Sequence, residues 1–182
     1  MRKTMWILAA LPLTAASAAD SPYQPLAFLA GHCWKGTFPD GKQTDEHCFS
    51  WIYDGKFLRD QHTVHGGGHP DYLGESIYFW NSTSKRVEYL YIENQGGYSQ
   101  GPVATEGRTL VFPPTQYVEN GQTQTYRSRW VPGENAYDVV TEFQSKEGWV
   151  PGFKLHMEQL PDTSPRVAAV LASARVMRRF EP

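Results

Sequence analysis

Apolar and polar residues alternate in short segments along most of the chain, and turn-forming residues separate each segment from the next. In the segment 136–143, Tyr137 and Val139 fall on one face, whereas Asp138 and Glu142 fall on the other. Alternation with a period of two is typical of a β-strand that buries one face. We expect strands at Cys33–Phe38, Gln43–Ile52, Phe57–His65, Tyr72–Trp80, Arg86–Glu93, Tyr98–Glu106, Thr109–Phe112, Thr123–Val131, Ala136–Phe143 and Phe153–Leu160.

The order and number of these segments predict an all-β, antiparallel domain. Strands that follow one another through short turns usually pair as antiparallel neighbours. A sheet of about ten strands tends to close on itself or to split, and closure removes exposed edges. The predicted fold is a roughly ten-stranded meander closed into a barrel, with a sandwich as the alternative. A short helical turn at Leu26–Leu29, stopped by Gly31, should precede the first strand.

One expected strand has a less regular pattern. Its apolar positions would form an inward face at Leu73, Ile77 and Phe79. That face would also carry Glu75, and a buried carboxylate needs a partner. Gln61 and Arg59 share a face of the preceding strand, and we expect one of them to reach Glu75.

The first residues differ from this strand pattern and are typical of an export signal. Arg2 and Lys3 precede an apolar stretch and a small-residue cleavage site. The stretch is shorter than the roughly 20 residues that a spanning helix needs. We expect a signal peptide at 1–19, a β-barrel domain at 20–160, and a mature protein that is periplasmic or secreted.

The C-terminal tail, residues 161–182, is predicted to be helical. Ser164 and Pro165 suit the N-cap and the first turn of a helix. An apolar stripe follows at helical spacing: Val167, Val170, Leu171, Ala174 and Met177. We expect this helix to lie on the barrel, and a membrane-surface or partner-binding helix is the alternative.

The two cysteines predict one disulfide, Cys33–Cys48. Both lie equally far from a turn centred between Asp40 and Gly41, so a symmetric hairpin would place them opposite each other. A three-residue turn would shift that pairing by one residue. The bridge closes a loop of roughly 15 residues and should contribute about 3 kcal/mol to stability. A redox or metal pair is disfavoured because the CxxC spacing is absent.

Composition narrows the range of partners. The net charge of −2 gives no basic footprint for nucleic acid. The six Trp, ten Tyr and nine Phe suit a β-rich interior. We expect no nucleic-acid partner and no stable membrane span.

The sequence contains a hydrolase motif, but the residues around it do not support a hydrolase site. The segment Gly97–Gly101 matches G-x-S-x-G around Ser99, and Asp138 and His156 follow in the order of an α/β-hydrolase triad. That mechanism needs a serine on a strand-to-helix elbow, and the residues after Ser99 cannot start a helix. We therefore expect no catalytic residue here, and an enzyme is the less favoured reading.

Several motifs give the chain a family resemblance. They are Phe28-Leu29-Ala30-Gly31-x-x-Trp34-x-Gly36, Pro39-Asp40-Gly41, Gly55-Lys56-Phe57-Leu58-Arg59-x-x-His62, Tyr72-x-Gly74-Glu75 and Gly96-Gly97. With these the chain resembles exported bacterial lipocalin-like (calycin-type) β-barrel proteins, most of uncharacterised function. It is similar, more distantly, to the nitrobindin-like haem-binding barrels. That second resemblance implies an axial histidine late in the barrel, at His156.

The histidines allow a metal site as a further possibility. His62 and His65 are an odd number of residues apart, so on one strand they should point to opposite faces. His69 follows three glycines, and a fold-back of that loop would be needed to bring it near. His62 therefore remains a candidate metal or haem ligand beside His156.

The expected function is binding of a small hydrophobic or amphipathic ligand inside the barrel, because a closed barrel of this size either fills with side chains or keeps a cavity. The candidate lining residues are Trp34, Tyr78, Tyr91, Tyr126, Trp130 and Tyr137. The first alternative is a haem- or metal-binding barrel that uses His156 or His62. The second is a purely structural barrel in which these side chains fill the core. No cofactor other than a possible haem is expected.

Overall fold

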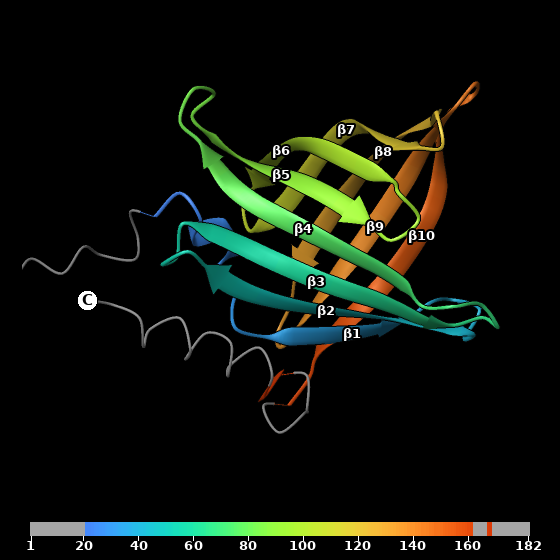
Figure 1. Cartoon of the computed structure of the whole chain (residues 1–182), viewed down its shortest axis with the longest axis horizontal. Coiled ribbons are helices and arrows are strands. Elements are labelled where there is room, and N and C mark those ends of the chain that lie inside the picture. Colours follow the sequence, from blue (N-terminus) through green and yellow to red (C-terminus); the bar gives the residue numbers. More distant parts are fainter. Residues whose placement is uncertain (1–20, 162–166, 169–182) are drawn as a thin grey trace, which may run out of the picture.

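A computed structural model of the 182-residue chain describes residues 21–161 and 167–168. Ten antiparallel strands close into a barrel, in the order β1-β10-β9-β8-β7-β6-β5-β4-β3-β2 (Figure 1). Their bounds are β1 Cys33–Thr37, β2 Gln43–Ile52, β3 Phe57–Gly66, β4 Tyr72–Asn81, β5 Arg86–Glu93, β6 Tyr98–Glu106, β7 Thr109–Glu119, β8 Gln122–Pro132, β9 Ala136–Ser145 and β10 Gly148–Gln159. The predicted closed antiparallel barrel is confirmed, and the alternative sandwich is wrong.

Two strands, β7 and β10, extend furthest beyond their predicted bounds, and each continues past a proline. β7 continues through Pro113, and its pairing with β8 shifts register between Phe112 and Thr115. β10 begins at Gly148, and its pairing with β9 shifts between Pro151 and Phe153. Proline cannot donate a ladder hydrogen bond, and a bulge lets the strand continue past it.

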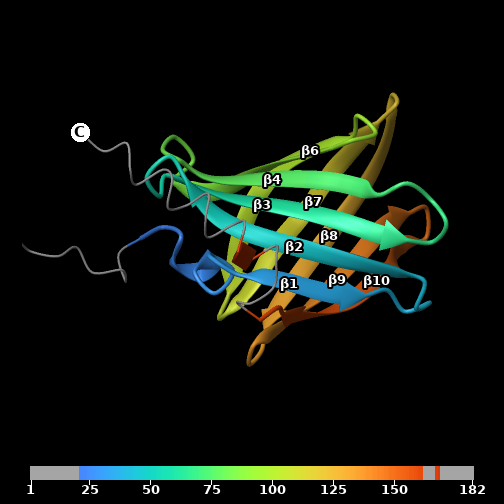
Figure 2. The ribbon, with the colours of Figure 1, turned by 60° about the horizontal axis from the view of Figure 1, so that its bottom comes forward.

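One end of the barrel is closed by the residues that precede β1. A 3-10 turn, η2 (Gln24–Leu26), lies at the end that also holds the β2–β3 and β4–β5 turns (Figures 1 and 2). Leu26 and Leu29 are fully buried there. The Tyr23 hydroxyl donates to Lys56 O at 2.6 Å and accepts from Trp80 N at 2.8 Å. The short turn was expected slightly later in the chain, and its role is to plug this end.

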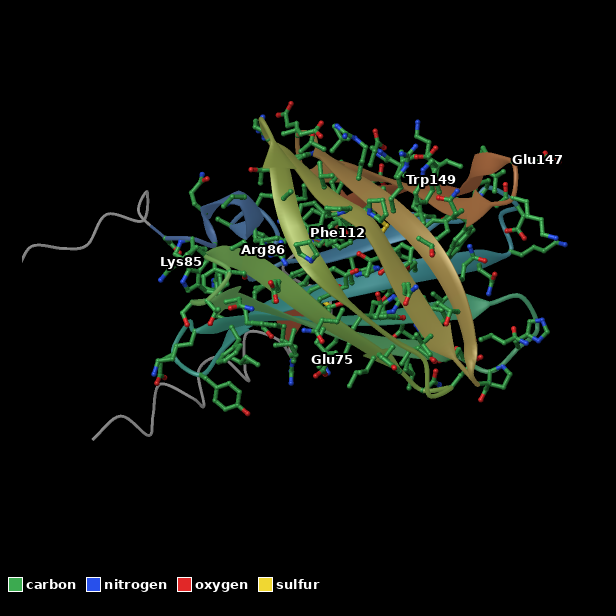
Figure 3. All side chains as sticks on the ribbon, turned by 90° about the horizontal axis from the view of Figure 1, so that it is seen from above. Glu75, Lys85, Arg86, Phe112, Glu147 and Trp149 are labelled. Atoms are coloured by element: carbon green, nitrogen blue, oxygen red, sulfur yellow. A yellow bond between two sulfur atoms is a disulfide. The ribbon has the colours of Figure 1, made fainter. Side chains whose placement is uncertain are left out.

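The opposite end carries the β1–β2, β3–β4 and β9–β10 turns (Figure 2). Figure 3 shows the two ends together, with Lys85 and Arg86 at the plugged end and Glu147 at the other. Gly66, Gly67 and Gly68 all adopt positive φ in the β3–β4 connection. This end of the barrel has no plug among the described residues.

The disulfide lies on the outer side of the barrel wall. Cys33 lies directly opposite Cys48 in the β1–β2 ladder, and the two form the predicted bridge. Both cysteines are buried, in a small apolar cluster with Leu160 and Val167 that is separate from the main core. The predicted hairpin register is confirmed.

The predicted inward face of β4 is wrong. Leu73 is half exposed, whereas Ser76 and Tyr78 are buried and face the interior. Glu75 lies on the outer surface, where Gln61 Nε2 donates to its Oε2 at 3.4 Å. The expected partner is therefore present, but outside the barrel, because β4 turns Ser76 and Tyr78 to the interior and Glu75 has the opposite parity.

The two ends of the chain are largely outside the described residues. The predicted signal peptide at 1–19 falls wholly outside them. Of the predicted helical tail, only Pro161, Val167 and Ala168 are described. The elements that the described chain defines are ten strands and one 3-10 turn. The predicted C-terminal helix lies largely outside the described residues, and Val167 and Ala168 within it are helical.

Candidate functional site

The barrel encloses a cavity of about 380 Å³. Mainly aromatic and aliphatic side chains line it, with one group of ionisable residues on the wall formed by β2 and β3. The lining residues are Phe38, Asp45, His47, Asp60, His62, Val64, Tyr72, Ser76, Tyr78, Tyr89, Tyr91, Phe112, Tyr117, Gln124, Tyr126, Ser128, Trp130, Val139, Thr141, Phe143, Phe153 and Leu155. The volume falls in the range of about 300–1,000 Å³ that is usual for small-molecule sites.

Strand register brings the ionisable residues together. His47 of β2 lies directly opposite His62 of β3 in the ladder, and their ring centroids are 4.7 Å apart. Asp45 and Asp60 lie two residues from these histidines along their own strands, and so they point to the same side. We call Asp45, His47, Asp60 and His62 the polar cluster.

Within the polar cluster, His47 lies between two carboxylates. Its Nδ1 is 2.9 Å from Asp60 Oδ2, and its Nε2 is 3.1 Å from Asp45 Oδ2. The other oxygen of Asp45 accepts from His62 Nδ1 at 3.2 Å. Asp45 therefore faces one histidine with each of its oxygens.

A line of hydroxyl groups leads from the polar cluster toward the unplugged end. His62 Nε2 is 3.0 Å from the Tyr91 hydroxyl, which is 2.6 Å from that of Tyr72. Tyr117 of β7 donates a hydrogen bond to Oε1 of Glu93, the last residue of β5, at 3.1 Å. Both ring nitrogens of His62 therefore have partners.

Burial and charge act in opposite directions on the polar cluster. Burial alone would lower the pKa of His47, but the carboxylates of Asp60 and Asp45 outweigh it and raise that pKa well above its usual value. Burial alone would raise the pKa of Asp45, but His47 and His62 together hold it far below the usual range. His47 is therefore protonated at neutral pH, and Asp45 is ionised.

The polar cluster contains a buried acceptor that has no donor. One aspartate lies at each ring nitrogen of His47, Asp60 at 2.9 Å and Asp45 at 3.1 Å. Asp60 is 2% exposed, and its Oδ1 is buried without a hydrogen-bond partner. Among the described residues, no lysine or arginine lines the cavity. A buried acceptor with no donor is costly, and such groups often mark a place where a ligand or an ion binds.

The remaining wall of the cavity is aromatic. Trp130 stacks on Tyr137 with ring centroids 5.3 Å apart and packs at an angle against Phe112 at 4.9 Å. Figure 3 shows Phe112 between the two ends of the barrel. The hydroxyl groups of Tyr126 and Tyr89, which also line the cavity, form a hydrogen bond of 2.8 Å. The cavity lining is thus mainly apolar, and its acidic residues and histidines are grouped on one side.

The predicted lining residues fall into two groups. Tyr78, Tyr91, Tyr126 and Trp130 line the cavity. Trp34 and Tyr137 are buried but belong to the core beside the plug, where both pack against Phe28. Their strand parity is inward, but the plug fills that end of the barrel.

The two candidate ligating histidines lie on opposite sides of the wall. His62 lines the cavity. The side chain of His156 is 59% exposed and pairs on the outer surface with Asp138 at 2.8 Å. His156 therefore cannot reach a group held in the cavity. His65 is also on the outer surface, paired with Asp71.

The hydrolase-like residues do not assemble. Ser99 is buried on the inner side, where Tyr126 donates to it at 3.1 Å. Asp138 and His156 contact each other outside the barrel. The barrel wall separates the serine from the other two.

Sequence reasoning missed three residues of the polar cluster, Asp45, His47 and Asp60. The signal that could have found two of them is the period-two spacing of Asp45, His47 and Phe49 in β2. Asp60 follows the same parity as His62 on β3.

The chain matches no known family in a comparison with protein-family models, and it matches no curated protein. In the part of the chain that is described, no helix is long and apolar enough to cross a membrane.

Proposed function

We propose that this protein is an exported binding protein that holds one small amphipathic molecule in its barrel cavity. The observation that carries the proposal is the combination of a mainly aromatic cavity of about 380 Å³ with acidic residues and histidines grouped on one side. A cavity of this kind favours a ligand with an apolar body and few polar groups at one end. Export is supported by the signal-like first residues and by the disulfide, which suits an oxidising compartment.

The polar end of the ligand should be a donor or a cation rather than a carboxylate. Asp60 Oδ1 is a buried acceptor without a partner, and Asp45 and Asp60 both line the cavity. A hydroxyl or an amine would satisfy that oxygen, whereas a carboxylate would face two others across a cavity without lysine or arginine. Fatty acids are therefore poor candidates.

Haem ligation through His156 does not fit this cavity. His156, which the nitrobindin resemblance implies, lies on the outer surface. Of the two candidate ligands predicted from the sequence, only His62 faces the cavity, where its ring nitrogens contact Asp45 and Tyr91.

The experiment is a fluorescence titration with the apolar dye N-phenylnaphthylamine, followed by competition. The mature wild type should bind one dye molecule. Ser128→Phe, which fills the cavity from β8, should abolish binding. Val131→Phe is the matched control, because Val131 is half exposed on the outer face of the same strand. If Ser128→Phe does not fold, Val139→Phe places the same ring in the cavity from β9.

Competition identifies the polar end of the ligand. Octylamine and octanol should displace the dye, and octanoate of the same chain length should displace it at least about tenfold less well, which corresponds to about 1.4 kcal/mol. Preferential displacement by octanoate would contradict the assignment of the donor end. Absence of dye binding in the wild type, or equal binding by Ser128→Phe, would leave a barrel whose interior is purely structural.

A further inference from the structure

We propose that Asp45, His47 and His62 form a binding site for one divalent first-row transition-metal ion at the wall of the cavity. This site goes beyond the proposed ligand binding and does not depend on it. One ligand atom from each of these residues lies within 4.8 Å of the others. Two imidazoles and one carboxylate are a ligand set that suits zinc or iron(II) and its neighbours, and not magnesium or calcium.

The distances match those between ligands of one ion. Asp45 Oδ2 is 3.1 Å from His47 Nε2, and Asp45 Oδ1 is 3.2 Å from His62 Nδ1. Metal bonds to nitrogen and oxygen of about 2.0–2.2 Å, at angles of about 90–110°, place two ligands of the same ion about 2.9–3.5 Å apart. The two distances involve different oxygens of Asp45, so a single ion that replaces the protons between Asp45 and the two rings would be held by both oxygens of this carboxylate.

Each histidine also has the outer contact that a metal ligand needs. His47 Nδ1 lies 2.9 Å from Asp60 Oδ2, and His62 Nε2 lies 3.0 Å from the Tyr91 hydroxyl. When a metal occupies one ring nitrogen, the other can keep its N–H and donate it to that oxygen. Such contacts fix the ring orientation and the tautomer of ligating histidines. Both are present at this site, and both involve buried or half-buried groups.

Gly74 of β4 has no side chain, and this leaves room for the ring of His62. A Cβ added at Gly74 of β4 would overlap the His62 ring at Nε2 and Cδ2, and it would also press on the Tyr91 ring. Glycine therefore allows the ring of His62 to approach the backbone of β4 closely. Since His62 and Gly74 are opposite each other in the β3–β4 ladder, this space is local to the site.

Charge provides an independent reason for a cation here. Asp60, 2% exposed, keeps a buried oxygen without a partner, and it lines the same cavity. A cation bound in the cavity near Asp60 would give this buried oxygen an electrostatic partner. The three proposed ligands all line the cavity, so the remaining coordination positions open into it.

The test is metal binding by the untagged mature protein after removal of metal with a chelator. Titration with zinc chloride by calorimetry should show one ion per chain. Cobalt(II) should give visible d–d absorption of a site with nitrogen and oxygen ligands. His62→Gln and Asp45→Asn should each weaken zinc binding by more than about tenfold, and Asp60→Asn should weaken it by about 10–100-fold. Gly74→Ala should weaken it as well, because it displaces the His62 ring.

The controls are the histidine–carboxylate pairs on the outer surface. His65→Gln and His156→Gln each remove a histidine that contacts an aspartate at about the same distance. Both variants should bind zinc as the wild type does. If His47→Gln does not fold, His62→Gln still tests the site, because His62 does not lie between two carboxylates.

Two results would overturn the proposal: absence of a stoichiometric zinc or cobalt complex in the wild type, or zinc binding that is lost in His156→Gln and kept in His62→Gln. Dye binding separates this outcome from failure of the proposed function. A wild type that takes up N-phenylnaphthylamine without binding zinc keeps the carrier function and loses the metal site. The opposite pattern keeps the metal site alone.

Discussion

His47 is the side chain on which the stability of the barrel interior should depend most sharply. It is the one imidazolium between Asp45 and Asp60, at 3.1 and 2.9 Å. At an effective dielectric constant of about 20, each such contact corresponds to about 5 kcal/mol of attraction before desolvation is subtracted. Replacing His47 by Gln removes the positive charge and leaves two buried carboxylates facing each other. Breaking a buried pair in this way costs about 3–5 kcal/mol.

The assay is urea unfolding of the mature protein at pH 7 with a chelator present. His47→Gln should lower the free energy of unfolding by about 3–5 kcal/mol with an unchanged m-value. His156→Gln, which breaks a half-exposed pair with Asp138, should lower it by less than about 1 kcal/mol. Acid should partly rescue His47→Gln. With the cation gone, burial and mutual repulsion raise the pKa of one carboxyl above its unfolded value of about 3.9, so the folded state takes up a proton first.

A loss below about 1 kcal/mol in His47→Gln at pH 7 would refute this reasoning, because it would mean that the two carboxylates do not depend on the imidazolium. Asp60→Asn separates charge from packing. It leaves one carboxylate for one imidazolium, and it should therefore cost much less than His47→Gln. An equal cost for both variants would show that shape, and not charge, explains the loss.

Three further outcomes are expected. In the metal-free wild type, the raised pKa of His47 contributes stability that is fully present below its unfolded pKa of about 6.5 and is lost as pH rises through the folded value. The lowered pKa of Asp45 contributes stability that is present above its unfolded pKa of about 3.9 and is lost as pH falls. Urea unfolding at a series of pH values should therefore show a loss of stability at both high and low pH. Replacing Cys33 and Cys48 by Ala opens a 15-residue loop and should cost about 3 kcal/mol by chemical denaturation. Trp34→Ala, at a site 3% exposed beside the plug, should cost about 3–5 kcal/mol and leave dye affinity unchanged in the folded fraction.

The barrel itself could be predicted because its signals are local. Alternation with a period of two and Gly-rich turns locate the strands, and a turn centred between Asp40 and Gly41 places Cys33 opposite Cys48. The β7 strand was cut short in prediction because Pro113 lacks an N–H. Its continuation depends on a bulge against β8, which is a property of the neighbouring strand and not of the local pattern.

Only part of the polar cluster could be predicted from the sequence. The same symmetry that pairs the cysteines, applied to a turn centred between Asp54 and Gly55, places His47 opposite His62, as the structure shows. The contact of His62 with Tyr91 depends on the barrel curving β5 toward β3 across β4. Nothing in a single strand reports that distance.

The sequence also could not show which face of a strand points into the barrel. On β4 either the face with Leu73 or the face with Tyr78 could have been buried, and the structure buries Tyr78 while Leu73 is half exposed. Trp34 and Tyr137 do point inward, but the plug occupies the space beside them. Which inward residues fill the core and which line the cavity depends on how far the plug enters the barrel.

Native mass spectrometry of the mature chain with N-phenylnaphthylamine tests the central claim most directly, because it reports stoichiometry and location in one measurement. The wild type and Val131→Phe should each carry one dye molecule per chain, and Ser128→Phe should carry none while remaining folded. An unmodified wild-type mass at saturating dye, or an adduct that Ser128→Phe retains, would contradict the claim that the barrel cavity is a binding site.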